Sequence, residues 1–280
     1  MILIDMNQIA LASLMMNTKM NNSKTIDETM VRHMILNSIR MYRKEHHSEY
    51  GEVVLTWDSK HSWRRDYFPE YKASRRKGRE ESDLNWDDIF GTLNKIRNEI
   101  KENFPYKYLE VFGAEADDII GFLCQENRDE KIMIISGDKD FIQLQKYSNV
   151  TQWSPITKKQ VNGFDPTIYL KEHILKGDTS DGVPNVLSPD KTFVNGLRQR
   201  PLSRKKIQSW LVGGGSDWND EVKRNFQRNL TLIDLTKTPE ELKNQIRLEY
   251  NNAPHGDRSK LLNYFMQNKL KELTENIGEF

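Results

Sequence analysis

Short apolar runs that end in acidic residues constrain the fold of this chain more than any other feature. The runs lie at residues 1–6, 52–57, 107–112 and 131–136, and they are rich in β-branched side chains. Such runs are too short for helices and are typical of strands buried on both faces, as in a parallel sheet. An acidic residue stands at or just beyond the end of each run, so the sheet should collect acids along one edge.

The segments between these runs have the pattern of helices, which predicts an α/β fold. The expected architecture is a mostly parallel central sheet with helices on both faces, and residues 149–154 are a further candidate strand. After residue 155 no strand is expected. We therefore predict an α/β catalytic domain over residues 1–180 and a smaller helical domain over residues 181–280. The expected helices lie at about residues 27–44, 86–103, 115 onward, 166–176, 203–212, 217–233, 239–248 and 258–275.

Eight carboxylates are candidate metal ligands. In an open α/β sheet the carboxyl ends of the strands form the ligand crevice. Acids gathered there raise one another's pKa values unless cations neutralise them. Oxygen ligands suit Mg²⁺ or Mn²⁺, whereas zinc prefers the His and Cys ligands whose spacing is absent here. Eight acids exceed the needs of one Mg²⁺ ion, which favours two ions. The candidates are Asp5, Asp58, Glu115, Asp117, Asp138, Asp140, Asp178 and Asp181.

Each acid has a simpler interpretation when it is taken alone. A single Asp at a strand end is more often a helix cap or a turn residue. Asp178 could merely start a turn, and Asp118 is expected to cap a helix or to face away, so it is left out of the ligand set. Four successive strand ends that all supply acid favour the metal site over these local roles.

Two basic segments predict contact with nucleic acid. Residues 60–80 carry eight basic residues against three acidic ones, with four aromatic residues among them. This composition is typical of a groove for single-stranded nucleic acid, although a solvated charge run is the simpler interpretation. Residues 191–206 contain no acid and could hold duplex phosphates or form an ordinary surface. The basic residues singled out are Arg64, Lys72, Arg75, Arg76, Arg198, Arg204 and Lys205.

The remaining features narrow the class of protein. The single cysteine, Cys124, excludes an internal disulfide framework, and only four apolar residues precede Asp5. We therefore expect no signal peptide and no membrane span. The favoured function is phosphodiester hydrolysis. A non-catalytic nucleic-acid-binding replication protein with one structural ion stays open, and a metal-dependent phosphatase is disfavoured because Asp5-Met6-Asn7 lacks a second Asp.

The order of the acidic motifs resembles the 5′-nuclease superfamily, which contains the structure-specific or flap endonucleases. Glu115-Ala116-Asp117-Asp118 is followed by Gly137-Asp138-Lys139-Asp140-Phe141 and then by Gly177-Asp178-Thr179-Ser180-Asp181. The resemblance covers nearly the whole chain. More narrowly, residues 63–66, 152–155 and 279–280 resemble the ribonuclease H branch from T-even bacteriophages.

This resemblance implies a function and partners. It implies a metal-dependent 5′-to-3′ exonuclease and flap endonuclease that acts on RNA–DNA and DNA–DNA duplexes with 5′ ends or flaps. Its task would be to remove RNA primers during lagging-strand phage replication, in the cytoplasm of the infected bacterial host. The implied partners include the single-strand-binding protein and the sliding clamp. We expect a monomer without a membrane partner.

The resemblance also implies roles for single residues. Asp5, Asp58, Glu115, Asp117 and Asp138 would surround the first Mg²⁺, and Asp140, Asp178 and Asp181 would serve the second, partly through water. Residues 60–80 would form a bridge or arch over the site, where Arg64, Lys72 and Arg75 face the scissile phosphate or the threaded strand. Residues 181–280 would bind the duplex. The glycine-rich turn of many relatives is missing after Asp181, where the chain continues as Gly182-Val183-Pro184-Asn185, so residues 191–206 would replace it by charge.

Overall fold

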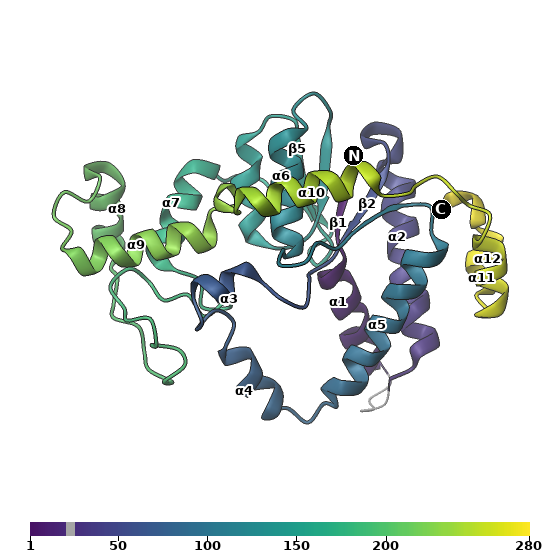
Figure 1. Cartoon of the computed structure of the whole chain (residues 1–280), viewed down its shortest axis with the longest axis horizontal. Helices are drawn as coiled ribbons and strands as arrows, with labels where there is room; N and C mark the ends of the chain where they lie inside the picture. Colours follow the sequence, from purple (N-terminus) through teal and green to yellow (C-terminus); the bar gives the residue numbers. More distant parts are fainter. Residues whose placement is uncertain (21–25) are drawn as a thin grey trace.

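A six-stranded sheet forms the centre of the computed structural model, which describes residues 1–20 and 26–280 (Figure 1). The first five strands are parallel, and the sixth pairs antiparallel at the edge of the sheet. The α/β class and the five predicted strands are confirmed. The sixth strand, beyond residue 155, was not expected, because two exposed residues carry no periodic signal. In spatial order the strands are β3 (Lys107–Leu109), β2 (Val53–Thr56), β1 (Ile2–Asp5), β4 (Ile132–Ile135), β5 (Val150–Ser154) and β6 (Lys159–Gln160).

The strand order places a switch point between β1 and β4. The chain moves outward from β1 through β2 to β3 and then returns to β4 on the other side of β1. Ile4 pairs with Ile135, so these two strands end side by side. In sheets of this kind, ligands bind outside the carboxyl ends of the strands at the switch point. Asp5 and Asp138 follow the two strands that flank it.

Helices cover both faces of the sheet and leave its central strands without solvent contact. Ile2 and Ile4 face one core and Leu3 faces the other, and all are fully buried. Helix α1 was not predicted, because its apolar residues are spread around the helix rather than along one side. The first face packs against α1 (Met6–Met20), α2 (Glu28–Tyr50) and α5 (Trp86–Asn103), and the second against α6 (Ala116–Glu126), the 3₁₀ helix η1 (Lys139–Lys146) and α10 (Glu240–Asn252).

The carboxyl-terminal helices divide between a separate lobe and the sheet. Helices α7 (Pro166–Lys176), α8 (Arg204–Gly213) and α9 (Asp220–Ile233) form the lobe at the left of Figure 1. After the short η2 (Leu235–Lys237), helix α10 crosses back over the sheet. Leu242 and Ile246 of α10 therefore belong to the same hydrophobic cluster as Leu3 of the sheet.

The last part of the chain completes the first core. Phe265 and Phe280 are fully buried in the cluster that contains Ile2 and Ile4. The single helix expected at 258–275 is instead two helices, and Lys269, with φ +55°, lies between them. A positive φ is costly for a residue with a Cβ and does not occur inside a right-handed helix. The elements here are α11 (Leu261–Gln267), α12 (Lys271–Glu275) and η3 (Ile277–Glu279).

The basic segment at residues 60–80, here called the bridge, leaves the sheet after β2 and leads to α5 (Figure 1). It contains two short helices, α3 (Trp63–Tyr67) and α4 (Ser74–Glu80), and α4 buries none of its residues. Its middle is anchored where the Lys72 amide donates to the Asp181 carbonyl at 2.7 Å. Lys72 has φ +56°, and Gly182, with φ +73°, packs against the Glu70 carbonyl. This close approach ties the bridge to the acidic loop at 178–182.

Candidate active site

Asp5 is the central acid of the site. It ends β1, is 7% exposed, and accepts hydrogen bonds from the Gln8 amide at 3.2 Å and the Ser136 hydroxyl at 3.0 Å. Burial, together with the charges of Asp58 and Asp138, raises the pKa of Asp5 to about 7. A carboxyl that is half protonated near neutral pH is poorly solvated and lacks a nearby cation.

Asp58, just after β2, and Asp117, in the first turn of α6, lie close enough to Asp5 for their charges to interact with it. The Ala116 amide, at the start of α6, donates to Asp58 at 2.8 Å and so fixes that carboxylate against the helix. Burial and the charges of Asp138 and Asp5 raise the pKa of Asp117 well above its usual range. Burial also raises the pKa of Asp58. The charges of these predicted acids therefore raise one another's pKa values.

Asp138 and Asp140 continue this group beyond β4. Asp138 caps η1 by accepting the Asp140 amide at 2.9 Å. Burial raises the pKa of Asp138, with contributions from the charges of Asp181 and Asp178. The pKa of Asp140 rises to about 8 through burial and the same neighbours, although His173 opposes the rise. The geometry thus links the predicted first and second metal groups into one continuous cluster.

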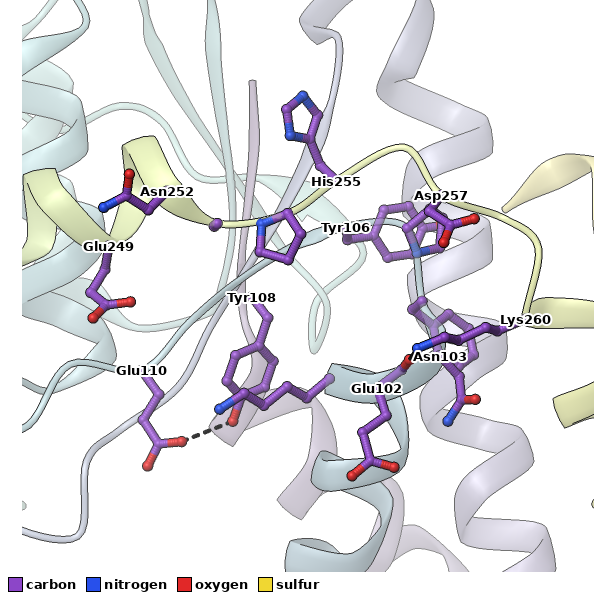
Figure 2. A pocket seen from close by; sticks show the side chains of 15 residues that line it. Glu102, Asn103, Tyr106, Tyr108, Glu110, Glu249, Asn252, His255, Asp257 and Lys260 are labelled. Carbon is purple, nitrogen blue, oxygen red and sulfur yellow. Dashed lines mark hydrogen bonds between the residues drawn. The ribbon is translucent and has the colours of Figure 1, made fainter.

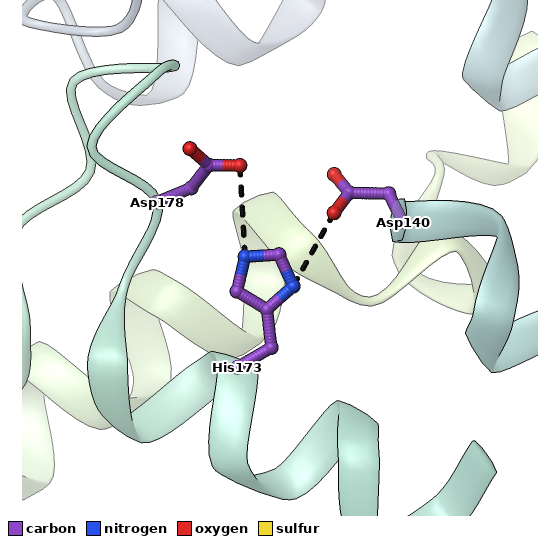
Figure 3. A group of neighbouring side chains, drawn as sticks. All are labelled: Asp140, His173 and Asp178. Carbon is purple, nitrogen blue, oxygen red and sulfur yellow. Dashed lines mark ion pairs between the residues drawn. The ribbon is translucent and has the colours of Figure 1, made fainter. Parts of the chain in front are cut away.

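His173 lies between Asp140 and Asp178 (Figure 3). Its Nδ1 is 3.3 Å from Asp140 and its Nε2 is 3.5 Å from Asp178. In the part of the chain that the structure describes, these three side chains form the one set whose ligand atoms all lie within 4.8 Å of one another. Burial acts to raise the pKa of Asp178, but hydrogen bonds from His173, the Ser180 hydroxyl and the Asp181 amide hold that pKa below its usual range.

His173 was not among the predicted site residues, because the histidines of the chain do not have the spacing of zinc ligands. A usable signal was present. The residue lies in the last turn of the predicted helix at 166–176, five positions before Asp178.

Glu115 and Asp181 differ from the other acids because side chains of the bridge hold them. Lys72 Nζ lies 2.6 Å from Glu115 and 3.6 Å from Asp181, and the Tyr71 hydroxyl donates to both carboxylates at 2.9 and 2.7 Å. Arg75 pairs with the other Asp181 oxygen. Burial favours the neutral form of Glu115, but Lys72 and Arg64 hold its pKa at about 2.

Arg64 is buried, which differs from its predicted role at the nucleic-acid surface. It is 2% exposed, and its guanidinium makes two parallel hydrogen bonds to Asp118 at 2.8 and 2.9 Å. It also donates to Glu115 and to the Leu232 carbonyl. We therefore remove Arg64 from the proposed nucleic-acid-binding set. Asp118 caps α6, as expected, and it also anchors this arginine.

Apart from Lys72 and Arg75, the remaining predicted nucleic-acid-binding residues lie outside the acidic cluster. Arg76 pairs with Glu80 along α4. In the helical lobe, the remaining basic residues are exposed, so their surface is open to a partner. They are Arg198, Arg204 and Lys205.

Two cavities bear on the location of the site. The larger, with about 340 Å³, lies at the β3 edge between the end of α5 and the segment that follows α10 (Figure 2). None of the predicted ligands lines it. The smaller holds only about 10 Å³, but Asp117, Asp140, Asp178 and Asp181 line it. We place the active site at the smaller cavity, because the chemically distinctive groups converge there.

The residues present fit divalent cations of the magnesium type. The side chains around Asp5, Asp117 and Asp138 offer oxygen atoms, and the raised pKa values show that the protein does not neutralise them by itself. Mg²⁺ and Mn²⁺ are the cations that such ligands favour.

Comparisons with known proteins agree with this site. Residues 1–173 match the family described as 5′-3′ exonuclease, N-terminal resolvase-like domain, and residues 165–280 match the family described as T4 RNase H, C terminal. The chain is 36% identical over 296 residues to the ribonuclease H of Enterobacteria phage T4, covering 99% of this chain and 95% of that protein. It is 31% identical to a 5′-3′ exonuclease of Buchnera aphidicola subsp. Acyrthosiphon pisum, over 71% of this chain and 72% of that protein.

Solved structures support the fold. A flap endonuclease of bacteriophage T5, in a complex with DNA and metal ions, aligns with a TM-score of 0.62 at 17% identity, covering 89% of this chain and 97% of that one. A T5 5′-exonuclease with bound zinc aligns with the same TM-score at 15% identity, over 90% and 98% of the two chains.

Within the described residues, no helix combines the length and apolar character needed to cross a membrane. The family matches confirm the resemblance that the acidic motifs predicted, and they set aside both the non-catalytic alternative and the phosphatase. The chain is therefore a phosphodiester-hydrolysing nuclease that belongs to the 5′-3′ exonuclease family and is a homologue of phage T4 ribonuclease H.

Proposed function

We propose that this nuclease is a metal-dependent 5′-to-3′ exonuclease and flap endonuclease that removes RNA primers from the lagging strand during phage DNA replication. Its substrates are RNA–DNA and DNA–DNA duplexes with a 5′ end or flap. The observation that carries the proposal is the cluster of buried, mutually repelling carboxylates at the carboxyl edge of the sheet. The identity to a phage ribonuclease H supports the hybrid substrate and the replication setting.

The cofactor in this proposal is a pair of Mg²⁺ ions, which Mn²⁺ can replace. When bound, such cations supply the charge that activates an attacking water and stabilises the departing 3′ oxygen. The first ion is assigned to the acids at the ends of β1, β2, β3 and β4, and the second to the acids near His173. These two ligand sets are Asp5, Asp58, Glu115, Asp117 and Asp138, and Asp140, Asp178 and Asp181.

Lys72 and Arg75 hold the scissile phosphate in this proposal. Both contact carboxylates of the site, so their cationic ends already lie at the position that a phosphate must approach. On substrate binding, each side chain donates to a phosphate oxygen in place of its carboxylate partner. Charge-assisted donors of this kind stabilise the negative charge that develops during phosphodiester cleavage.

The remaining basic residues contact the flanking nucleic acid. Arg76 on the bridge faces the threaded single strand, and Arg198, Arg204 and Lys205 neutralise duplex phosphates from the helical lobe. Loss of the glycine-rich turn after Asp181 leaves this charge as the main duplex contact. We further propose that the protein acts as a monomer in the host cytoplasm, beside the single-strand-binding protein and the sliding clamp.

Cleavage of labelled flap, nick and RNA-primer substrates by an Asp138→Asn variant tests the function. The substitution removes one negative charge where two ligand groups meet. We expect cleavage to fall by at least about 100-fold, while duplex binding measured by fluorescence anisotropy persists. Asp129→Asn, at an exposed position, is the matched control and should cleave normally.

The same assay with chelator separates metal catalysis from other mechanisms. EDTA should stop cleavage, and added Mg²⁺ or Mn²⁺ should restore it. Undiminished turnover in excess EDTA, or full activity of the Asp138→Asn variant, would contradict the proposal.

A further inference from the structure

Two stacked rings, the exposed Phe112 and the partly exposed His61, lie on loops that also carry acids of the site. Phe112 is 76% exposed, and its ring centroid lies 5.5 Å from that of His61, with an interplanar angle of 14°. His61 Nε2 also contacts Asp66 at 2.7 Å, which fixes the orientation of the imidazole. Because 76% of Phe112 is exposed, burial in the hydrophobic core does not account for a phenylalanine at this position.

The two loops that carry the rings are held together by their backbones. The Ser59 amide donates to the Ala114 carbonyl at 3.0 Å, and the Trp63 amide donates to the Gly113 carbonyl at 2.9 Å. Gly113 adopts φ +87°, a conformation that L-residues rarely take, and this turn separates Phe112 from the buried Ala114. The rings are therefore presented on a fixed base rather than on mobile loops.

These same loops carry two of the predicted metal ligands. His61 follows Asp58 by three residues, and Phe112 precedes Glu115 by three residues. Three residues span at most about 10 Å, a length that corresponds to roughly three stacked nucleotides of one strand. A strand whose phosphate reaches the acids therefore has neighbouring bases within reach of the rings. Exposed Lys60 and Arg65 flank His61 and complement the charge of the adjoining phosphates.

We propose that His61 and Phe112 form a stacking platform for one unpaired nucleobase of the strand being cut, within about three nucleotides of the scissile phosphate. This inference rests on the proposed function and adds a base contact to it. Aromatic faces accept any base, because every base has a π-face. The platform would therefore favour substrates with an unpaired 5′ strand without imposing a sequence.

The test uses the full-length Asp138→Asn protein, which keeps the substrate intact, and compares Phe112→Leu with Phe112→Tyr. Leu keeps the apolar volume but removes the ring, whereas Tyr keeps the ring. The probe is 2-aminopurine placed at each of the first three unpaired nucleotides of a 5′ flap. We expect its fluorescence to be quenched at one position by the parent and by Phe112→Tyr, but not by Phe112→Leu.

Affinity supplies the second measurement. Phe112→Leu should weaken binding of the flap substrate by about tenfold, the scale of one base–aromatic stack, and leave binding of a nicked duplex unchanged. Equal quenching by both variants would overturn the platform. Equal loss on flap and nick would also overturn it, because that result would mark a general folding or docking role. Binding is read without cleavage, so quenching by a wild-type protein that fails to cut would sink the proposed function and leave the platform standing.

Discussion

The acidic site has two halves that differ in how their charge is balanced. Glu115 and Asp181 are paired with cations from the bridge, and the pKa of Glu115 lies at about 2. Asp5, Asp117 and Asp138 form no ion pair within residues 1–20 and 26–280, and their pKa values are raised. Glu115 and Asp181, together with Asp118 and Arg64, are here called the paired half. Asp5, Asp117 and Asp138 are called the unpaired half.

This difference indicates which acids the protein neutralises with its own cations, although the proposed ligand sets draw acids from both halves. Carboxylates that are bonded to Arg or Lys contribute to folding and lose that contribution when the partner is removed. Carboxylates that only repel one another oppose folding until a cation binds. The protein therefore supplies its own countercharge to one half, and under the proposed function bound cations neutralise the other half.

The largest effect is expected from Arg64→Met in the paired half. The change leaves Asp118 fully buried without its guanidinium partner. Breaking a buried pair in this way costs about 3–5 kcal/mol, which urea unfolding can measure. Arg65→Met, at an exposed neighbouring position, should change stability by less than about 0.5 kcal/mol. Similar unfolding midpoints for the two variants would refute a structural role for Arg64.

Neutralising one acid in each half should change the free energy of unfolding in opposite directions. In EDTA, Glu115→Gln should lower the free energy of unfolding by about 1–3 kcal/mol, because charged donors lose their acceptor. Asp117→Asn should raise it by at least about 1 kcal/mol, because it removes a repelling charge. Thermal unfolding of both variants measures this. If both substitutions shift the midpoint in the same direction, the two halves are not distinct.

A further expected effect is a pH trend in the metal-free protein. The pKa values of Asp5 and Asp140, about 7 and about 8, lie above their unfolded values near 4. The stability that these two protonated carboxyls contribute to the folded state is therefore present at low pH. It is lost as the pH rises from 5 to 8. His173, whose pKa is also raised, adds to the same trend. The contribution of Glu115 to stability changes with pH only below pH 5, because its pKa is lowered to about 2.

Thermal scans in EDTA check this trend. The midpoint should fall by about 2–4 °C for each kcal/mol lost between pH 5 and pH 8. Mg²⁺ should weaken the trend, because bound cations favour the ionised carboxylates. A midpoint that rises with pH in EDTA would show that the unpaired half is already neutralised.

The acids at the strand ends could be predicted from sequence because local rules determine them. A short β-branched run predicts a buried parallel strand, and parallel strands end at one edge of the sheet. Asp5, Asp58, Asp117 and Asp138 follow from those two rules alone. The α/β class and most of the helices could be predicted from the same kind of local pattern.

The partners of the paired half could not be found in the same way. Arg64 and Asp118 are 54 residues apart, and no local pattern shows that this arginine turns inward while Arg65 faces solvent. Residues 60–80 look uniformly basic, so the sequence does not separate buried anchors from surface contacts. The return of residues 261–280 to the first core is equally non-local.

That return has a consequence for how the enzyme is made. Leu261, Phe265 and Phe280 fill the layer beneath Ile2 and Ile4, the strand that carries Asp5. The ribosome needs on the order of 10 s after β5 to synthesise them. Until then, the first strand lacks part of its hydrophobic support. We therefore expect the strand that carries Asp5 to become stably packed only after residues 261–280 have left the ribosome.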